Sequence, residues 1–454
     1  MSPPVPTNGN ETSVTRVIRR RALFLALLAF LVYNANFRDI AAGDSLPARF
    51  LPFALWGHGT VYLDPVADVT ISYHSRPYWI VRAPNGHFAS MYPIVTPVLL
   101  LPLYVPAVLY LEVTGWTDAH IAAAGHLMEK LAASVVASLT VALFYLLVRR
   151  RTSERCALLL AVTLAFATNT WATSSQALWQ HGVTELLVVI ALLALDDGAS
   201  PARLAIAGAA CGLLAVNRPP DVLLAAGFAA FVFLERRREA WPFVVAGAAA
   251  AAPFLAYNWL AFGRLGGGYS YVFAATLAGG ASSFFSLPLL PGLAGLLVSP
   301  GKGLLLFCPA LLFLLAHVRH RFPDARTRRL AACLGVSVVA LMILYAKTDW
   351  RAGSSYGPRF MVDAVPILVW LLIPVVEALR RPALLAFLVL VGFGIAVQAI
   401  GAFCYPKGGS DDRNSVWDFR RPAFVIEARA GLMRPAFVDS LRKRLGAGLT
   451  ENSP

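Results

Sequence analysis

The sequence predicts an all-α polytopic membrane protein, and its composition, the length of its apolar segments and the placement of its charges all support this fold class. Of the 454 residues, 58% are hydrophobic and only 14% are charged, and the mean hydropathy is +0.63. A soluble domain carries roughly a quarter charged residues. Apolar segments recur from residue 22 to about residue 403, each long enough to cross or nearly cross roughly 30 Å of hydrocarbon. A soluble protein is therefore excluded.

The net charge of +14 is concentrated in short basic blocks at the ends of the apolar segments. Membrane topology requires this distribution, whereas a nucleic-acid binder needs a basic face interleaved with aromatic residues. Basic blocks mark the cytoplasmic side of a membrane protein. The tail 1–21 is therefore predicted to be cytoplasmic and the first helix, 22–43, to run outward. The basic blocks are 16–21, 149–155, 235–239, 317–329 and 380–381.

The segment 92–113 decides the number of membrane crossings. It is apolar enough to span, but it contains four prolines, and each proline removes a helical hydrogen bond. If it spanned, the arginines at 149–151 would lie outside. We interpret it as an interfacial or re-entrant segment, with a full span as the alternative. About eleven spans are then predicted, at 22–43, 126–148, 156–173, 182–196, 203–217, 220–234, 241–257, 302–317, 330–346, 361–379 and 383–403.

This topology predicts a transmembrane domain over 22–403, followed by an extracytoplasmic tail, 404–454. In the first extracytoplasmic loop, 44–125, the apolar spacing of residues 45–59 predicts a helix lying in the membrane interface. The cytoplasmic loops are short and basic, so the functional residues are expected on the outer side. The other large outer segments are 258–301 and 347–360.

Two familiar kinds of site are not indicated. The five cysteines include no CxxC pair, so neither a disulfide framework nor a zinc site is implied. The sequence GKG at 301–303 is not a nucleotide-binding loop, because that loop needs Gly-x4-Gly-Lys-Ser/Thr after a strand.

The outer end of the first helix contains unusual polar residues. Eleven apolar residues, 22–32, lead into the sequence YNANFRD, and Asp44 follows at the membrane surface. Polar groups at this depth are costly unless they face a protein interior or a watery cavity. One interpretation is an ordinary helix end with a surface pair between Arg38 and Asp39. The alternative is a carboxylate base at the floor of an outward-facing cavity.

The order of these elements resembles the GT-C superfamily of integral-membrane glycosyltransferases over roughly residues 15–405. An outward first helix ends in an acidic motif, interfacial helices follow, and a Pro-rich segment beginning with MYP precedes a helix that ends in arginine. The nearest branch contains protein O-mannosyltransferases and the aminoarabinose transferase of lipid A. Its first outer loop opens with an acidic pair whose aspartate is the expected base. The resemblance therefore implies a GT-C-type bundle with Asp44 as catalytic base, although Ser45 stands where the branch usually has Glu.

Two further segments, VSPGKGLLLFCP at 298–309 and DWRAGSSYGPRF at 349–360, resemble segments of bacterial members of the superfamily. The resemblance implies a sugar donor linked to a polyprenyl phosphate. Negative charge grows on the departing phosphate, which Arg binds in a fork and Lys as a point charge. The residues predicted to bind the donor phosphate are Lys302, Arg351, Tyr356 and Arg359; the alternative for the two arginines is contact with lipid headgroups.

Contacts to the sugar or the acceptor are expected from the first outer loop and from two short outer turns. The turns are ATSSQALWQHG at 172–182 and VNRPPD at 216–221. The candidates are Arg49, Asp64, Trp179, His181 and Arg218, although a structural role at a helix end is an equal alternative for His181. Some GT-C enzymes use a divalent cation, so Mg²⁺ or Mn²⁺ is a candidate cofactor, without assigned ligands.

The resemblance implies an inverting glycosyltransferase that acts on the outer face of a bacterial inner membrane. The bacterial source is inferred from 34 Arg against 5 Lys. The expected partners are the polyprenyl-phosphate sugar, the bilayer, and a glycan, lipid or protein acceptor of the cell envelope. One alternative is a transporter or flippase for a lipid-linked or anionic solute, although no inverted repeat is visible. Another is an oligosaccharide ligase or polymerase. Release of free polyprenyl phosphate would distinguish a transferase from a transporter.

Overall fold

The computed structural model describes residues 9–72, 77–196, 198, 200–276, 285–433 and 438–439. Within these ranges the chain is a bundle of helices, with one antiparallel hairpin of β1 (Ile80–Arg82) and β2 (Phe88–Ser90). Residues 1–8 of the predicted cytoplasmic tail and residues 440–454 of the predicted extracytoplasmic tail lie outside the described residues.

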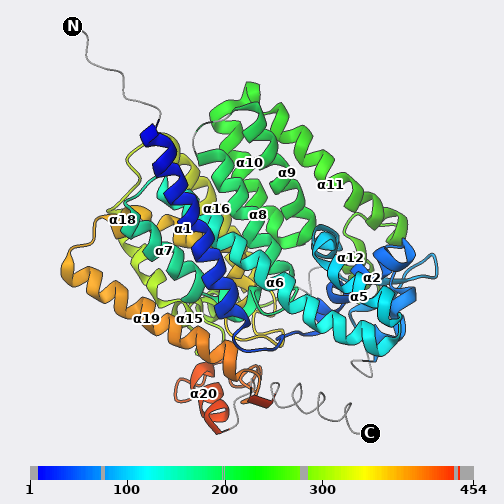
Figure 1. Cartoon of the computed structure of the whole chain (residues 1–454). Helices are drawn as coiled ribbons and strands as arrows, with labels where there is room; N and C mark the ends of the chain where they lie inside the picture. Colours follow the sequence, from blue (N-terminus) through cyan, green and yellow to red (C-terminus); the bar gives the residue numbers. More distant parts are fainter. Residues whose placement is uncertain are drawn as a thin grey trace.

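The first helix, α1 (Gly9–Asn34), crosses the front of the bundle but ends earlier than predicted (Figure 1). The predicted helix 22–43 is wrong at its outer end, because polar side chains there take the backbone out of the helix. Asn34 donates back to the carbonyl of Phe30 at 2.8 Å, and Phe37 has a positive φ of 52°. Asn36 donates to the side chain of Gln176 at 2.6 Å. The chain therefore runs as a loop from residue 35 to the short turn η1 (Gly43–Ser45).

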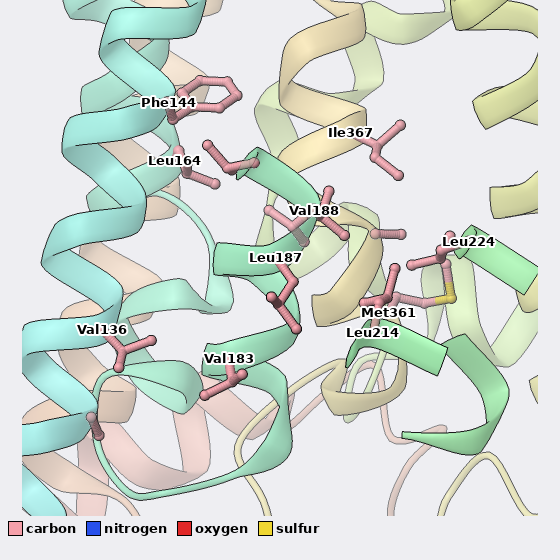
Figure 2. Packing of buried hydrophobic residues seen from close by; sticks show 14 of the residues in the cluster. Val136, Phe144, Leu164, Val183, Leu187, Val188, Leu214, Leu224, Met361 and Ile367 are labelled. Atoms are coloured by element: carbon pink, nitrogen blue, oxygen red, sulfur yellow. The ribbon is translucent and has the colours of Figure 1, made fainter. Parts of the chain in front are cut away.

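The centre of the bundle is built around α8 (Gln180–Asp196). Val183, Leu187 and Val188 of this helix face buried residues from neighbouring helices, as Figure 2 shows. Every residue of α8 from Leu186 to Leu195 is apolar. The neighbouring elements are α6 (Asp118–Arg149), α7 (Glu154–Phe166), η4 (Thr170–Ser174), α9 (Pro201–Asn217) and α10 (Val222–Arg236).

Helix α11 (Trp241–Phe262) packs unusually closely against α9. A Cβ atom added at Gly208 would collide with the backbone of Phe243, and one added at Gly212 would collide with Gly247. Small residues let helix backbones approach one another where water provides no driving force. This interface therefore has the character expected inside a bilayer.

Prolines divide two of the predicted spans and the predicted interfacial or re-entrant segment 92–113. The segment 302–317 forms α15 (Leu304–Phe307) and η7 (Pro309–Val318). A proline has no N–H to donate to the preceding turn, which accounts for these breaks. The segment 361–379 forms η8 (Arg359–Ala364), α17 (Val365–Leu371) and α18 (Ile373–Glu377), and the segment 92–113 forms α4 (Val95–Leu99), η3 (Leu101–Tyr104) and α5 (Val105–Thr114).

The predicted interfacial helix corresponds to α2 (Leu46–His58). It lies with α5 and with α12 (Gly267–Thr276) at one end of the molecule (Figure 1). At the same end, α20 (Ala423–Met433) packs against α19 (Arg381–Cys404). The remaining elements are η2 (Asp64–Val66), α3 (Ala67–Ile71), η5 (Pro219–Asp221), η6 (Arg237–Glu239), α14 (Leu289–Val298) and α16 (Ala325–Ala346).

Five helical stretches in the described part of the chain are long and apolar enough to cross a membrane. Apolar side chains also point outward, including Leu385 and Val389 of α19, which are 63% and 68% exposed. These features indicate a multi-pass membrane protein, whereas the number of about eleven spans stays a prediction. The five stretches are 118–149, 241–274, 325–346, 359–377 and 381–404.

Candidate active site

A cavity of about 1180 Å³ opens at one end of the bundle. Helices α8 and α10 and the turn η8 begin there, and α9 and α16 end there, so that loops rather than helix interiors supply most of its polar groups. Helix α12 and the segment following α19 complete the lining. The wall is mainly apolar, and its ionisable groups are Asp44, Tyr78, Tyr92, His181, Arg218, Tyr269, Tyr345, Asp349, Arg359, Asp411 and Arg413.

Asp44 is held in this cavity by three donors. Its Oδ1 accepts hydrogen bonds from the hydroxyls of Tyr92 at 2.7 Å and Tyr78 at 3.1 Å, and its Oδ2 pairs with Nη1 of Arg359 at 2.7 Å. Gly43 allows this arrangement, because a Cβ atom there would lie 2.5 Å from the hydroxyl of Tyr78. The local sequence therefore fixes the direction of the carboxylate.

The surroundings of Asp44 favour its ionised form. Burial raises the pKa of this carboxyl, but the charge of Arg359 and the hydrogen bonds from Tyr92, Tyr78 and Arg359 outweigh burial. The pKa of Asp44 therefore lies below its ordinary value, and the group is a carboxylate at neutral pH.

Arg359 is oriented by aromatic rings and by a glycine. Its guanidinium lies 5.0 Å from the ring centroid of Trp179 and 5.3 Å from that of Phe360, within the range of cation–π attraction. A Cβ atom on Gly353, whose φ is +93°, would lie 2.7 Å from the guanidinium carbon. These contacts present Arg359 to the cavity at the first residue of η8.

A second polar group occupies the wall at the start of α8 and the end of α9. Nδ1 of His181 lies 2.7 Å from Oδ1 of Asp363, and Arg218 pairs with the other oxygen of the same carboxylate. The guanidinium of Arg218 also lies 5.3 Å from the ring centroid of Tyr345. His181 and Arg218 line the cavity, whereas Asp363 is fully buried and does not.

Comparison with solved structures relates this architecture to a known one. ArnT from Cupriavidus metallidurans bound to undecaprenyl phosphate superposes with a TM-score of 0.54 and 14% identity, over 93% of this chain and 71% of that chain. The same protein in the apo state gives a TM-score of 0.50 and 15% identity, over 93% and 75%. ArnT is a GT-C membrane glycosyltransferase. The chain has the GT-C fold. No family model and no curated protein sequence matches it.

Five residues singled out from the sequence lie on the cavity wall of this GT-C fold: Asp44, Trp179, His181, Arg218 and Arg359. They come from four separate stretches of the chain, and the fold brings them together at one end of the bundle. Asp44, the predicted catalytic base, thus shares the cavity wall with Arg359, one of the predicted phosphate ligands. It also shares the wall with Trp179, His181 and Arg218, the predicted sugar or acceptor contacts from the two outer turns.

Three residues predicted to bind the donor phosphate do not line the cavity. Lys302 is buried and donates to the carbonyl oxygens of Ser355 at 2.5 Å and Gly353 at 3.3 Å. The hydroxyl of Tyr356 donates to the carbonyl of Val397 at 2.9 Å. Arg351 pairs with Asp349 at 3.0 Å, and its side chain is 41% exposed. All three hold backbone or loops in the positions observed.

Arg49 and Asp64 also lie away from the cavity. Arg49 is 1% exposed and pairs with Asp39 at 2.5 Å and with Glu129. Asp64 accepts a hydrogen bond from the backbone of Phe88 at 3.1 Å and so supports the β1–β2 hairpin. Both residues stabilise the first outer loop.

Sequence reasoning did not identify Tyr78, Tyr92 and Asp363 as site residues. Tyr92 belongs to the MYP motif, whose position before the broken helix was noted without assigning a role to its hydroxyl. Asp363 follows YGPRF within an apolar segment, where a carboxylate is costly without a partner. That cost is the one feature that marks Asp363 from sequence. Among the described residues, no group of three or more His, Cys, Asp and Glu is arranged to hold a metal ion.

Proposed function

We propose that this protein is a membrane glycosyltransferase that transfers a sugar from a polyprenyl-phosphate donor to an acceptor hydroxyl. The GT-C fold and the undecaprenyl phosphate bound to ArnT support a lipid-linked donor. The observation that carries the proposal is the ion pair of Asp44 and Arg359 on the wall of one large, mainly apolar cavity. The pair supplies a base for the acceptor and a cation for the departing phosphate.

In the proposed reaction, the acceptor hydroxyl donates a hydrogen bond to Asp44 and attacks the anomeric carbon opposite the phosphate. The new carbon–oxygen bond forms as the bond to the phosphate oxygen breaks. The proton passes to Asp44, and the electron pair leaves with the polyprenyl phosphate. Because the pKa of Asp44 is low, this carboxylate is a weak base that orients the hydroxyl and accepts its proton late. Backside attack inverts the anomeric configuration.

Arg359 is the proposed donor-phosphate ligand, since its guanidinium forms two parallel hydrogen bonds to phosphate oxygens in its preferred geometry. Lys302 supports it indirectly, because its ammonium group holds the carbonyls of the 353–355 loop next to the guanidinium. Arg413 lines the same cavity and pairs with Asp349 at 3.0 Å. Charge complementary to the developing phosphate anion lowers the barrier.

We place the cavity on the outer face of a bacterial inner membrane. Two basic blocks lie at the far ends of helical segments that begin at the cavity. The block 235–239 ends α10, and the block 380–381 follows α18, which ends the segment that η8 begins. By the positive-inside rule those blocks are cytoplasmic. The acceptor is therefore proposed to be a glycan, lipid or protein of the cell envelope.

The test is transfer from radiolabelled polyprenyl-phosphate sugars in proteoliposomes, comparing the wild type with Asp44→Asn. We expect labelled product and freed polyprenyl phosphate, both reduced about 10²–10⁴-fold in the variant, the usual contribution of a general base. Asp64→Asn is the matched control, because Asp64 lies outside the cavity, and it should retain activity. Movement of intact donor between leaflets without release of polyprenyl phosphate would instead establish a transporter.

A further inference from the structure

The buried carboxylate of Asp363 organises the second polar group of the cavity. Its two oxygens have different partners, His181 on Oδ1 at 2.7 Å and Arg218 on Oδ2. A carboxylate beside a guanidinium is ionised and can only accept hydrogen bonds, so Nδ1 of His181 must carry the hydrogen. In the neutral imidazole, Nε2 is then the acceptor. Asp363 thus determines which atom of His181 is offered to a ligand.

The guanidinium of Arg218 adds no net positive charge to this wall. The charge of Arg218 is balanced by Asp363, and Asp221 lies 3.9 Å from the same guanidinium. Its face is covered by the ring of Tyr345. The wall therefore offers hydrogen-bonding groups without net positive charge. Such a wall suits hydroxyl groups, which both donate and accept, better than it suits a phosphate.

A further donor lies beside this pair. Nε2 of Gln180 is buried, lacks a hydrogen-bond partner among the described residues, and belongs to a residue of the cavity lining. A buried amide without a partner costs free energy unless a ligand satisfies it. The ring of Trp179 connects the two walls, 6.5 Å from the ring of His181 and 5.0 Å from the guanidinium of Arg359. A sugar attached to a phosphate at Arg359 would reach His181 across this ring.

We propose that His181, Arg218 and Gln180 bind the hydroxyls of the transferred sugar, and that Asp363 is the positioning residue for His181 and Arg218. The inference rests on the proposed function and specifies its donor: a neutral, hydroxyl-bearing sugar rather than one with a charged substituent. His181 accepts from one hydroxyl, and Arg218 and Gln180 donate to others.

The experiment compares His181→Ala, Asp363→Asn and the double variant with a polyprenyl-phosphate hexose that the wild type uses and with its mono-deoxy analogues. Removing one hydrogen bond to a substrate hydroxyl should lower kcat/KM roughly 10–100-fold for the complete sugar. For the analogue that lacks the hydroxyl bound by His181, kcat/KM should be almost the same in His181→Ala as in the wild type. If Asp363 acts through His181, the double variant should discriminate among the analogues as His181→Ala does.

Binding measurements in nanodiscs separate this inference from the proposed function. His181→Ala should weaken binding of the polyprenyl-phosphate hexose but leave binding of free polyprenyl phosphate unchanged. His87→Ala is the control, since His87 lies outside the cavity. Equal loss for both lipids, or equal loss of kcat/KM for every analogue, would overturn the sugar subsite. Failure of the wild type to release polyprenyl phosphate from any donor would overturn the proposed function, and the binding comparison would still decide the subsite. If Asp363→Asn does not fold, His181→Ala and Gln180→Ala carry the test.

Discussion

Two carboxylates only five positions apart, Asp39 and Asp44, form ion pairs with arginines in very different surroundings. Asp39 pairs with Arg49 at 2.5 Å, and Asp44 pairs with Arg359 at 2.7 Å. The side chain of Arg49 is 1% exposed, whereas those of Arg359 and Asp44 are 11% and 22% exposed. The difference lies in what surrounds each pair.

The pair of Arg49 is part of a saturated network. Its guanidinium contacts Asp39, Glu129 and His126, and Glu129 also accepts from the backbone of Leu178 at 3.1 Å. Burial raises the pKa of Asp39, but the hydrogen bond from His126 and the charge of Arg49 outweigh it and lower this pKa to about 2. These contacts link the loop after α1 with α2 and α6.

The pair of Arg359 is less saturated. Nε of Arg359 is buried without a hydrogen-bond partner in the described part of the chain, and aromatic rings rather than further carboxylates contact its faces. A guanidinium that pairs with one carboxylate and keeps an unused N–H donor can form hydrogen bonds to an incoming anion. The comparison teaches that the number of partners, rather than residue type, separates the structural pair from the catalytic candidate.

The largest effect on stability is expected from Arg49→Ala. This change leaves Glu129, whose side chain is 0% exposed, as an uncompensated buried charge. Breaking a buried ion pair in this way costs about 3–5 kcal/mol. Thermal unfolding in detergent should show a large decrease in Tm. Arg351→Ala is the control, because that half-exposed pair should contribute under about 1 kcal/mol. If the two variants were equally stable, the buried pair of Arg49 would contribute no more to stability than the half-exposed pair of Arg351.

Arg359→Ala should instead impair activity with a small effect on folding. Losing one electrostatic stabiliser of the transition state lowers kcat/KM roughly 10²–10³-fold. The charge of Arg359 also lowers the pKa of Asp44, so its removal should raise that pKa. The carboxylate then protonates at a higher pH, and the acid limb of the pH–rate profile should move upward. An unchanged acid limb in transfer assays would contradict a role for Asp44 as the titrating base.

The sequence predicted helices where apolar runs are long, because a segment in hydrocarbon must satisfy its own backbone hydrogen bonds. It did not predict the end of α1 or the breaks at Pro309, Pro366 and Pro374. At the end of α1, the side chain of Asn36 is held by a hydrogen bond to Gln176, which lies 140 positions away in the chain. Local propensity carries no information about such a partner.

The same limit applies to the site. Asp44 was identifiable from the cost of polar residues at the membrane edge and from the resemblance to the acidic motif of the GT-C superfamily. Arg359 was identifiable because it lies at the outer start of a predicted helix. The choice among Lys302, Arg351 and Arg359 depends on the path of the 353–359 loop, which places one guanidinium on the cavity and directs the ammonium of Lys302 at backbone carbonyls. Charge alone does not distinguish these three cations.

The smallest expected effects concern the two phenols that donate to Asp44. Burial first, and then the charge of Asp44, raise the pKa of both Tyr92 and Tyr78, so both hydroxyls remain protonated donors at neutral pH. The hydrogen bond of Tyr92 is shorter, at 2.7 Å against 3.1 Å, and Tyr78 is half exposed.

Tyr92→Phe should therefore reduce kcat/KM by roughly 10-fold, since a hydrogen bond to a charged group is worth about 1.5–3 kcal/mol and water replaces part of it. Tyr78→Phe should reduce it only a few-fold. Each loss raises the pKa of Asp44, so the acid limb should move to higher pH, but less than in Arg359→Ala. The three variants then rank the partners of one carboxylate. If Tyr92→Phe moved the acid limb as far as Arg359→Ala, the hydrogen bond rather than the ion pair would determine the charge state of Asp44.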